Sequence, residues 1–554
     1  MAEGRDRHLR RARLLDRVHA RLAGRARLSP VWRAGDDPVA QGSQLRGARL
    51  LAGGAAPVPG VPEAGERQDS FAWLDDLAAV GDGAARSFAQ DRVLDWVRRH
   101  GRGAGWRAGI TGQRLMHWLG RGAFLRRGLT EAQAALMARV LARQVLFLAR
   151  RWQAAPVGLP RLAALAGLIE GAGALSGLER HRPSALAAFA RHCEAVVGGE
   201  GAVASRNPEE LCAILALLNR VTRQAGEAEL PPGIAAARLR IVPTLRALRH
   251  ADGGLARFHG GGRGRDGALD AALAESGCRS RREGLAMGYA RLAAGRTTAI
   301  MDAAPPPRGA PLAHAATLAF ELTSGRRPLI VNCGSGAGFG AEWARAARAT
   351  ASQSVLGLDG YSSARLGPGG DERLSEAPDT VPGEAALTAT SHRMGAAHNG
   401  WRRTHGLMYA RTLDLTLDGR ALTGEELLIA LSEEDRTIFA RARADTGGAV
   451  AFSVRFHLHP EAEAELSAAR DMVRLALKSG EVWELTQDGA DAISLQPSVW
   501  LEPGRAEPRA TLQVVLSGRA MDYATRVRWA LAKSAETPSV LRDFGPDPEP
   551  DEQE

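Results

Sequence analysis

The sequence predicts an α+β protein with two or more domains, in which a helical N-terminal half precedes an antiparallel, β-rich C-terminal half. Two observations support this fold class. From about residue 68 to residue 250, apolar residues recur at intervals of three and four, which is the spacing of a helix face. After about residue 254, the apolar runs become short and partly alternating, and Gly, Asp-Gly and Ser-Gly turns separate them.

The helical half consists of long segments joined by short connections. The segments follow Ser, Thr, Asn-Pro or Pro, which are typical residues at helix starts, and they are rich in Leu, Ala and Arg. Short connections favour consecutive antiparallel helical hairpins. The predicted helical segments are 70–100, 130–152, 159–175, 184–197, 207–225 and 233–250.

The C-terminal half shows three strong hairpin signals, at 322–331, 415–422 and 477–485. Each has a Ser-Gly or Asp-Gly turn between apolar runs, and such turns need residues that tolerate positive φ. Long helical segments between these strands are mostly lacking, so the pattern favours an antiparallel β-sandwich over a parallel sheet.

The first residues are basic and amphipathic, and the last are acidic and rich in proline. The N-terminus lacks the apolar core of a secretory signal. It is suited to an acidic membrane surface, although a first helix of the helical domain is the simpler interpretation. We predict a basic extension over 1–44, a helical domain over 45–252, a β domain over 253–545 and a disordered tail over 546–554.

The formal net charge of +10 comes from 72 basic and 62 acidic residues. Lys478 and Lys533 are the lysines, and every other basic residue apart from histidine is arginine, spread along the whole chain. A nucleic-acid surface needs clustered positive charge, so no nucleic-acid partner is predicted. The four cysteines form no CxxC pair and indicate neither a zinc ribbon nor a disulfide framework. An uninterrupted apolar stretch long enough to span a membrane is also lacking.

A glycine-rich stretch at 329–340, LIVNCGSGAGFG, offers an alternative function. Residues 336–341 fit G-x-G-x-x-A, and Asp359 lies where a ribose-binding acid would stand in a nucleotide-binding unit over 329–359. The flanking segments are predicted hairpins, however. The strand at 329 follows a tight turn and is expected to pair antiparallel with 317–322, which does not suit a βαβ unit.

Four stretches of the chain resemble the heparinase II/III-like family: 248–262 (LRHADGGLARFHGGG), 314–336 (HAATLAFELTSGRRPLIVNCGSG), 406–419 (GLMYARTLDLTLDG) and 452–460 (FSVRFHLHP). The resemblance extends from about 45 to 530 and implies an (α/α) toroid followed by an antiparallel β domain. It also implies a lyase that cleaves uronate polysaccharides by β-elimination. That chemistry neutralises the uronate carboxylate, removes the C5 proton with a Tyr or His base, and protonates the leaving oxygen.

The resemblance implies candidate site residues, several of which differ from the lyase pattern. The catalytic candidates are His314, Asn207, Glu210 and Tyr289. The substrate-binding candidates are Arg206, Arg257, His259, His398, Asn399, Trp401 and Arg403. Arginine matches carboxylate and sulfate geometry, and a tryptophan ring can stack on a sugar.

Several of these positions have a structural alternative. The string SRNPEEL at 205–211 also matches a helix start, with Asn207 as N-cap and Pro208 in the first turn. Tyr289 also suits a half-buried strand position, and His457 and His459 suit a structural role at the edge of the core.

The resemblance further implies that family members hold a structural zinc through two histidines and an aspartate. The corresponding positions here are His314, Asn332 and Gln353. Amides are poor zinc ligands, so neither a metal nor another cofactor is predicted.

The sequence therefore predicts a polysaccharide lyase-like protein with several substituted catalytic positions and an acidic polysaccharide as partner. The alternative is a non-catalytic relative that binds acidic glycans. The resemblance places the protein in the periplasm or cell envelope, and the lack of a visible signal peptide leaves the cytoplasm as the alternative.

Overall fold

The structure is a computed structural model that describes residues 2–33, 42–53, 68–367, 373–502, 505 and 507–537. The chain divides into two compact units. The first comprises 1–199, 212–241 and 274–278, and the second comprises 200–211, 242–273 and 279–554. The acidic tail predicted at 546–554 lies outside the described residues. The domain limits drawn from the sequence remain predictions.

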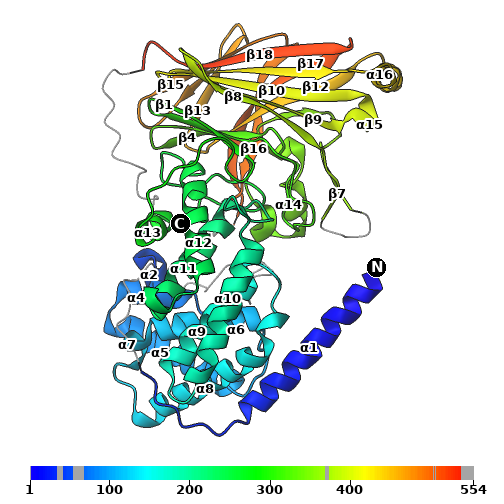
Figure 1. Ribbon diagram of the computed structural model, residues 1–554. Coiled ribbons are helices and arrows are strands. Elements are labelled where there is room, and N and C mark those ends of the chain that lie inside the picture. Colours follow the sequence, from blue (N-terminus) through cyan, green and yellow to red (C-terminus); the bar gives the residue numbers. More distant parts are fainter. Residues whose placement is uncertain are drawn as a thin grey trace. The chain divides into compact units, whose positions relative to one another are not determined.

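Helices dominate the first unit (Figure 1). In chain order the helices before the first strand are α1 (Ala2–Gly24), α2 (Gln44–Leu51), α4 (Trp73–Val80), α5 (Gly83–His100), α6 (Ala108–Gly120), α7 (Gly122–Arg126), α8 (Glu131–Arg151), α9 (Leu159–Ala174), α10 (Arg182–Val196), α11 (Pro208–Ala225), α12 (Pro232–Ala247) and α13 (Ala268–Glu275). The last three of these helices, α11, α12 and α13, have residues in both units. Single 3-10 turns are η1 (Trp152–Ala154), η2 (Glu179–His181) and η3 (Glu227–Glu229).

Helix α9 lies at the centre of the first unit and packs against α6, α8 and α10. Glycines allow the closest of these contacts. A Cβ atom on Gly112 of α6 would lie 2.3 Å from the carbonyl oxygen of Ala163, and one on Gly167 of α9 would lie 2.4 Å from that of Gly112. The two helix backbones can therefore touch only because neither position carries a side chain.

The segment predicted as one helix over 70–100 is two helices. Gly81 adopts a left-handed conformation with φ of 75° and ends α4. Asp82 then caps α5 by accepting a 2.7 Å hydrogen bond from the backbone N–H of Ala85. The Gly-Asp pair is therefore a stop signal followed by a start signal, although the apolar periodicity continues across it.

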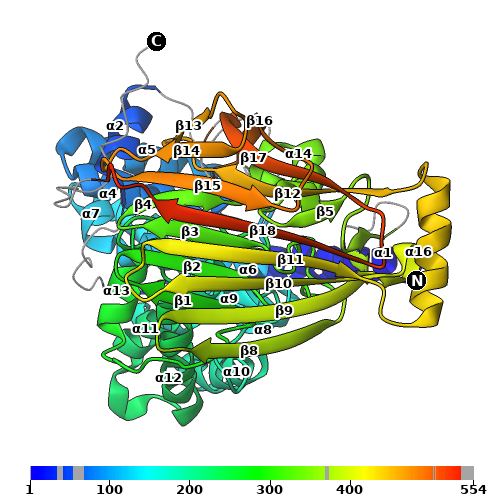
Figure 2. The same cartoon turned by 90° about the horizontal axis from the view of Figure 1, so that it is seen from above.

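Two eight-stranded sheets form most of the second unit. The first sheet has the order β1-β2-β3-β4-β12-β17-β16 with β5 also on β12, and the second has the order β13-β14-β15-β18-β11-β10-β9-β8. Figure 2 shows strands of the second sheet lying side by side. The strands are β1 (Tyr289–Ala294), β2 (Thr297–Asp302), β3 (Phe320–Ser324), β4 (Arg327–Val331), β5 (Leu356–Leu358), β6 (Arg365–Leu366), β7 (Leu374–Glu376), β8 (Thr380–Leu387), β9 (Ser391–Trp401), β10 (Leu407–Thr416), β11 (Ala421–Ile429), β12 (Val450–Leu458), β13 (Glu463–Leu466), β14 (Met472–Ala476), β15 (Val482–Asp488), β16 (Ala492–Trp500), β17 (Arg509–Ala520) and β18 (Ala524–Lys533).

All pairings within these sheets are antiparallel, as predicted. The three predicted hairpins are β3–β4, β10–β11 and β14–β15. Short helical elements complete the unit: η4 (Gly336–Phe339), α14 (Ala341–Ala346), η5 (Thr350–Ser352), α15 (Arg402–His405) and α16 (Glu433–Asp445).

A buried layer joins the two sheets. Phe320 on β3 stacks on Trp529 on β18, with ring centroids 5.7 Å apart. Arg411 on β10 forms a fully buried ion pair of 2.8 Å with Glu426 on β11. The guanidinium also donates to the backbone oxygen of Leu318, beside the first sheet, at 2.8 Å. The core of the sandwich therefore contains both aromatic packing and a satisfied charge pair.

The glycine-rich stretch is not a nucleotide-binding unit. Its strand, β4, pairs antiparallel with β3 and with β12. The following helix α14 has only six residues, and β5 is antiparallel to β12. A dinucleotide site needs a parallel βαβ crossover with the phosphate at the start of a full helix. The nucleotide-binding alternative for 329–359 is therefore wrong.

Within the part of the chain that the structure describes, one helical stretch, Glu131–Ala154, is long and apolar enough to cross a membrane, and half of its most apolar window is buried inside the fold. A core helix of this kind passes the same test.

Candidate functional site

The candidate site begins at the turn that starts α11. The side-chain oxygen of Asn207 accepts hydrogen bonds from the backbone N–H groups of Glu209 at 2.9 Å and Glu210 at 3.2 Å. Asn207 is thus the N-cap that the sequence indicated. Glu210 accepts a 2.5 Å hydrogen bond from the hydroxyl of Ser205, and Glu209 accepts one of 2.8 Å from the backbone of Gly262. These polar groups fix the turn and attach it to the loop around 260.

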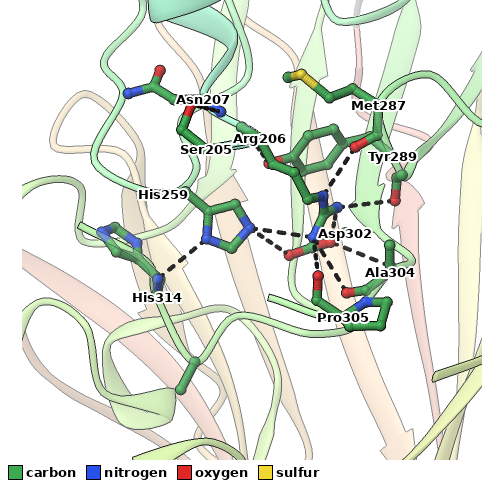
Figure 3. A network of polar contacts seen from close by, with 12 residues as sticks. Ser205, Arg206, Asn207, His259, Met287, Tyr289, Asp302, Ala304, Pro305 and His314 are labelled. Carbon is green, nitrogen blue, oxygen red and sulfur yellow. Dashed lines mark hydrogen bonds and ion pairs between the residues drawn. The ribbon is translucent and has the colours of Figure 1, made fainter. Parts of the chain in front are cut away.

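The backbone of this turn is left-handed at Arg206, with φ of 52°. The turn directs the Arg206 side chain towards the loops that flank β1 and β2 (Figure 3). All five N–H directions of the guanidinium meet acceptors at 2.5 to 3.3 Å. The acceptors are the backbone oxygens of Met287, Gly288, Ala304 and Pro305 and a carboxylate oxygen of Asp302.

Asp302 ends β2 and is completely buried between a cation and an imidazole. Its Oδ1 lies 2.5 Å from Nη2 of Arg206, and its Oδ2 lies 3.2 Å from Nε2 of His259. The backbone N–H of His314 donates to Nδ1 of His259 at 3.2 Å. Since Nδ1 is an acceptor, the proton of the neutral ring lies on Nε2 and faces the carboxylate. The chain Arg206–Asp302–His259–His314 is therefore continuous, as Figure 3 shows.

Tyr289, at the start of β1, is buried beneath this chain. Its hydroxyl donates a 2.6 Å hydrogen bond to the backbone oxygen of Arg206. The Arg206 guanidinium carbon lies 4.6 Å from the centroid of the tyrosine ring. The Tyr289 side chain therefore stabilises the turn that carries Arg206, and its hydroxyl proton is used in this hydrogen bond.

Burial controls the titration of the cluster. Burial would raise the pKa of Asp302, but Arg206 and His259 reverse this effect and hold the pKa below its usual value. Burial lowers the pKa of His259 despite the neighbouring Asp302, and burial together with His259 and Arg348 lowers the pKa of His314 to about 3. Burial raises the pKa of Tyr289 well above its usual value. At neutral pH, the two histidines and the tyrosine are neutral and Asp302 is ionised.

The structure thus brings together four predicted residues, Arg206, His259, Tyr289 and His314, around one that the sequence did not single out, Asp302. The other predicted residues lie elsewhere or are engaged. Arg257 is buried, 3.9 Å from both Asp252 and Glu321. A lone acid after an apolar strand, as in AIMDAA, is the signal that points to Asp302.

The predicted residues around β9 form a separate group. Trp401 is buried and donates from its indole to the backbone oxygen of Tyr361 at 3.3 Å, so it presents no open ring face to a sugar. His398 is also buried and accepts from the backbone of Gly400 at 3.1 Å. Asn399 accepts from the backbone of Asp379, and Arg403 pairs with Glu376 on the surface at 2.5 Å. These side chains serve the local structure.

The residues at the zinc positions of the family do not fit a metal. Asn332 uses its oxygen to accept from the backbone of Ser354 at 2.9 Å, which leaves its NH2 group, a donor, for any further contact. Gln353 donates its NH2 group to the backbone of Ala347, and only an amide oxygen is left beside His314. Among the described residues, no three His, Cys, Asp or Glu side chains are grouped to hold a metal ion. Zinc sites need more strong ligands than one imidazole.

Comparisons with known proteins agree with the fold and the family resemblance. Residues 278–530 match the model of the heparinase II/III-like C-terminal domain. FtsZ-localized protein C of Caulobacter vibrioides is 32% identical over 495 residues, which cover 84% of this chain and 81% of that protein. The chain therefore belongs to the heparinase II/III-like family.

Solved structures show the same architecture at low identity. A crystal structure of heparinase III superposes with a TM-score of 0.67 at 11% identity, covering 95% of this chain and 91% of that one. A mutant of the heparan sulfate lyase HepC from Pedobacter heparinus gives 0.57 at 13% identity, covering 94% and 88%. The fold is thus the helical toroid and antiparallel β-sandwich that the sequence predicted.

Proposed function

We propose that this protein is a non-catalytic member of the heparinase II/III-like family and acts by binding. The observation that supports this most strongly is the state of Tyr289 and Arg206. A lyase base must reach a substrate proton, and a carboxylate-binding arginine must have free donors. Here the Tyr289 hydroxyl is buried and donates to a backbone oxygen, and every donor of Arg206 is used.

Lyase assays test the non-catalytic assignment. The purified chain is incubated with heparin, heparan sulfate, alginate and other uronate polysaccharides, and ultraviolet absorbance reports the unsaturated product. We expect no turnover. Turnover that Tyr289→Phe abolishes, and that Tyr361→Phe at an exposed tyrosine leaves intact, would refute the proposal.

The partner we propose is FtsZ. Support comes from the relative whose name describes it as FtsZ-localized, because the similarity runs through both the helical and the β-rich parts of the chain. Co-sedimentation of the purified chain with polymerised FtsZ from the same organism tests this. We expect the chain in the pellet only when FtsZ is polymerised, and a fluorescent fusion at the FtsZ structure in cells. A chain that stays in the supernatant and is diffuse in cells would contradict the proposal.

An acidic polysaccharide is the second candidate partner. A surface hollow of about 870 Å³ in the second unit is lined by Arg291, Arg296 and Arg326, together with small residues. Burial and the nearby Arg249 and Arg281 lower the pKa of Arg291 to about 10, as expected where positive charge accumulates. Arginine suits sulfate and carboxylate groups.

Binding to immobilised heparin tests this second candidate. Arg296→Gln with Arg326→Gln should elute at lower salt than the parent, while Arg519→Gln at a distant strand should not. Elution of all three proteins at the same salt concentration would exclude the hollow as a glycan-binding site. Periplasmic or envelope localisation belongs with this candidate, and cell fractionation tests it.

A further inference from the structure

Helix α1 carries two exposed stripes of opposite chemistry that run side by side. Leu14, Val18 and Leu22 are 59%, 45% and 49% exposed, and a spacing of four places them on one face of the helix. An arginine immediately precedes each of them, at 13, 17 and 21, and these arginines are exposed as well. Leu15, also exposed, widens the apolar stripe.

The helix already uses its other face for the fold. Ala20 and Ala23 are buried, and Asp16 forms a 2.7 Å ion pair with Arg151 of α8. A Cβ atom on Gly103 would lie 2.4 Å from the backbone oxygen of Ala20, so the contact on that side is close. Figure 1 shows α1 (dark blue) as one long helix. The core-facing side of α1 is thus occupied by alanines, and the leucine–valine stripe stays exposed.

The chemistry of the two stripes matches an anionic lipid surface. A helix that lies in a membrane interface combines bulky apolar residues on one side with arginine or lysine beside them. In α1 the arginines outnumber the acidic residues, and arginine-rich sequence continues N-terminal to the stripes.

We propose that α1 holds the protein on an anionic lipid bilayer by inserting Leu14, Val18 and Leu22 between headgroups that Arg13, Arg17 and Arg21 contact. The helix lies in the plane of the surface and does not span it. This inference is independent of the FtsZ and glycan proposals, because a lipid vesicle contains neither partner.

Vesicle flotation with the purified full chain tests the proposal. The vesicles are phosphatidylcholine alone, or phosphatidylcholine with phosphatidylglycerol, at low and high salt. We expect binding to the anionic vesicles that high salt weakens, and little binding to phosphatidylcholine. Each arginine near the surface contributes roughly 1 kcal/mol, or about fivefold in affinity.

Variants separate the two stripes. Val18→Glu with Leu22→Glu should abolish flotation, and Arg13→Gln with Arg17→Gln should reduce the affinity by about 25-fold. The matched controls are Leu239→Glu, at a leucine that is exposed on α12, and Arg127→Gln with Arg180→Gln, at exposed arginines of the same unit. Circular dichroism verifies that each variant is folded. The proposal would be overturned if the parent protein did not float, if it floated equally with both lipids, or if the α1 variants behaved like their controls. Capture of α1 by a protein partner without lipid binding would also overturn it.

Discussion

Replacement of Arg206 by methionine distinguishes a structural cluster from a ligand site. The substitution keeps much of the side-chain volume but removes the five hydrogen bonds of the guanidinium. It also leaves Asp302 ionised and completely buried, with only His259 beside it. Loss of one partner from a buried ion pair costs about 3–5 kcal/mol, because the remaining charge stays desolvated. We expect the free energy of unfolding to fall by about this amount.

A double-mutant cycle assigns the cost to the pair. Asp302→Leu removes the carboxylate but leaves Arg206 its four backbone acceptors. The double variant, Arg206→Met with Asp302→Leu, should lose less stability than the sum of the single variants, by about 0.5–3 kcal/mol. Urea unfolding followed by far-ultraviolet circular dichroism measures all four proteins, and heparin binding is measured in parallel.

The control is Arg403→Met, because Arg403 and Glu376 form a surface pair whose side chains are 74% and 46% exposed. Solvent screens such a pair, so we expect a cost below about 1 kcal/mol. A similarly small cost for Arg206→Met, additive single variants, or a selective loss of heparin binding without loss of stability would refute the structural role.

Three further predictions concern packing, histidine burial and metal binding. Gly424→Ala places a Cβ about 2.1 Å from the Trp529 ring, so we expect a loss of about 1–3 kcal/mol, measured as a lower urea midpoint. His314 and His398 have pKa values lowered to about 3 by burial, whereas an unfolded histidine titrates near pH 6.5. Their contribution to the free energy of unfolding is complete above about pH 6.5 and falls by about 1.4 kcal/mol per pH unit for each histidine down to about pH 3. The urea midpoint should therefore be lower at pH 5 than at pH 7, and His398→Gln should reduce this difference. Dialysis against a chelator should leave the thermal midpoint unchanged, because the residues that replace the family zinc ligands do not fit a metal; a fall that added zinc restores would contradict this.

The parts of the fold that the sequence predicted are those set by neighbouring residues. The Asn207 cap and the three hairpins depend on local backbone chemistry, and the structure confirms them. The 70–100 segment was predicted as one helix because the apolar period continues through Gly81, although a single left-handed residue is enough to end α4.

The candidate site depends on contacts that sequence patterns do not contain. Asp302 meets Arg206 across 96 residues of chain, and no spacing rule relates the two positions. For Trp401, the sequence pattern suggested a binding role that the structure does not support. A tryptophan beside arginines suggests a sugar platform, but whether its ring is open depends on the loop at Tyr361, which covers it.

The backbone of the cluster supports the proposal that the cluster does not open for a substrate. Arg206 and His259 both adopt left-handed conformations, with φ of 52° and 50°. Such strain persists in non-glycine residues only where the surroundings fix the conformation. Here the fixing groups are the Tyr289 hydroxyl on the Arg206 carbonyl and the buried Asp302 between the two side chains. A ligand that displaced either group would leave a buried charge or carbonyl without its partner. Recognition of a partner is therefore expected on exposed surfaces, such as the arginine-lined hollow or α1, and the cluster keeps the loops around β1 and β2 in place.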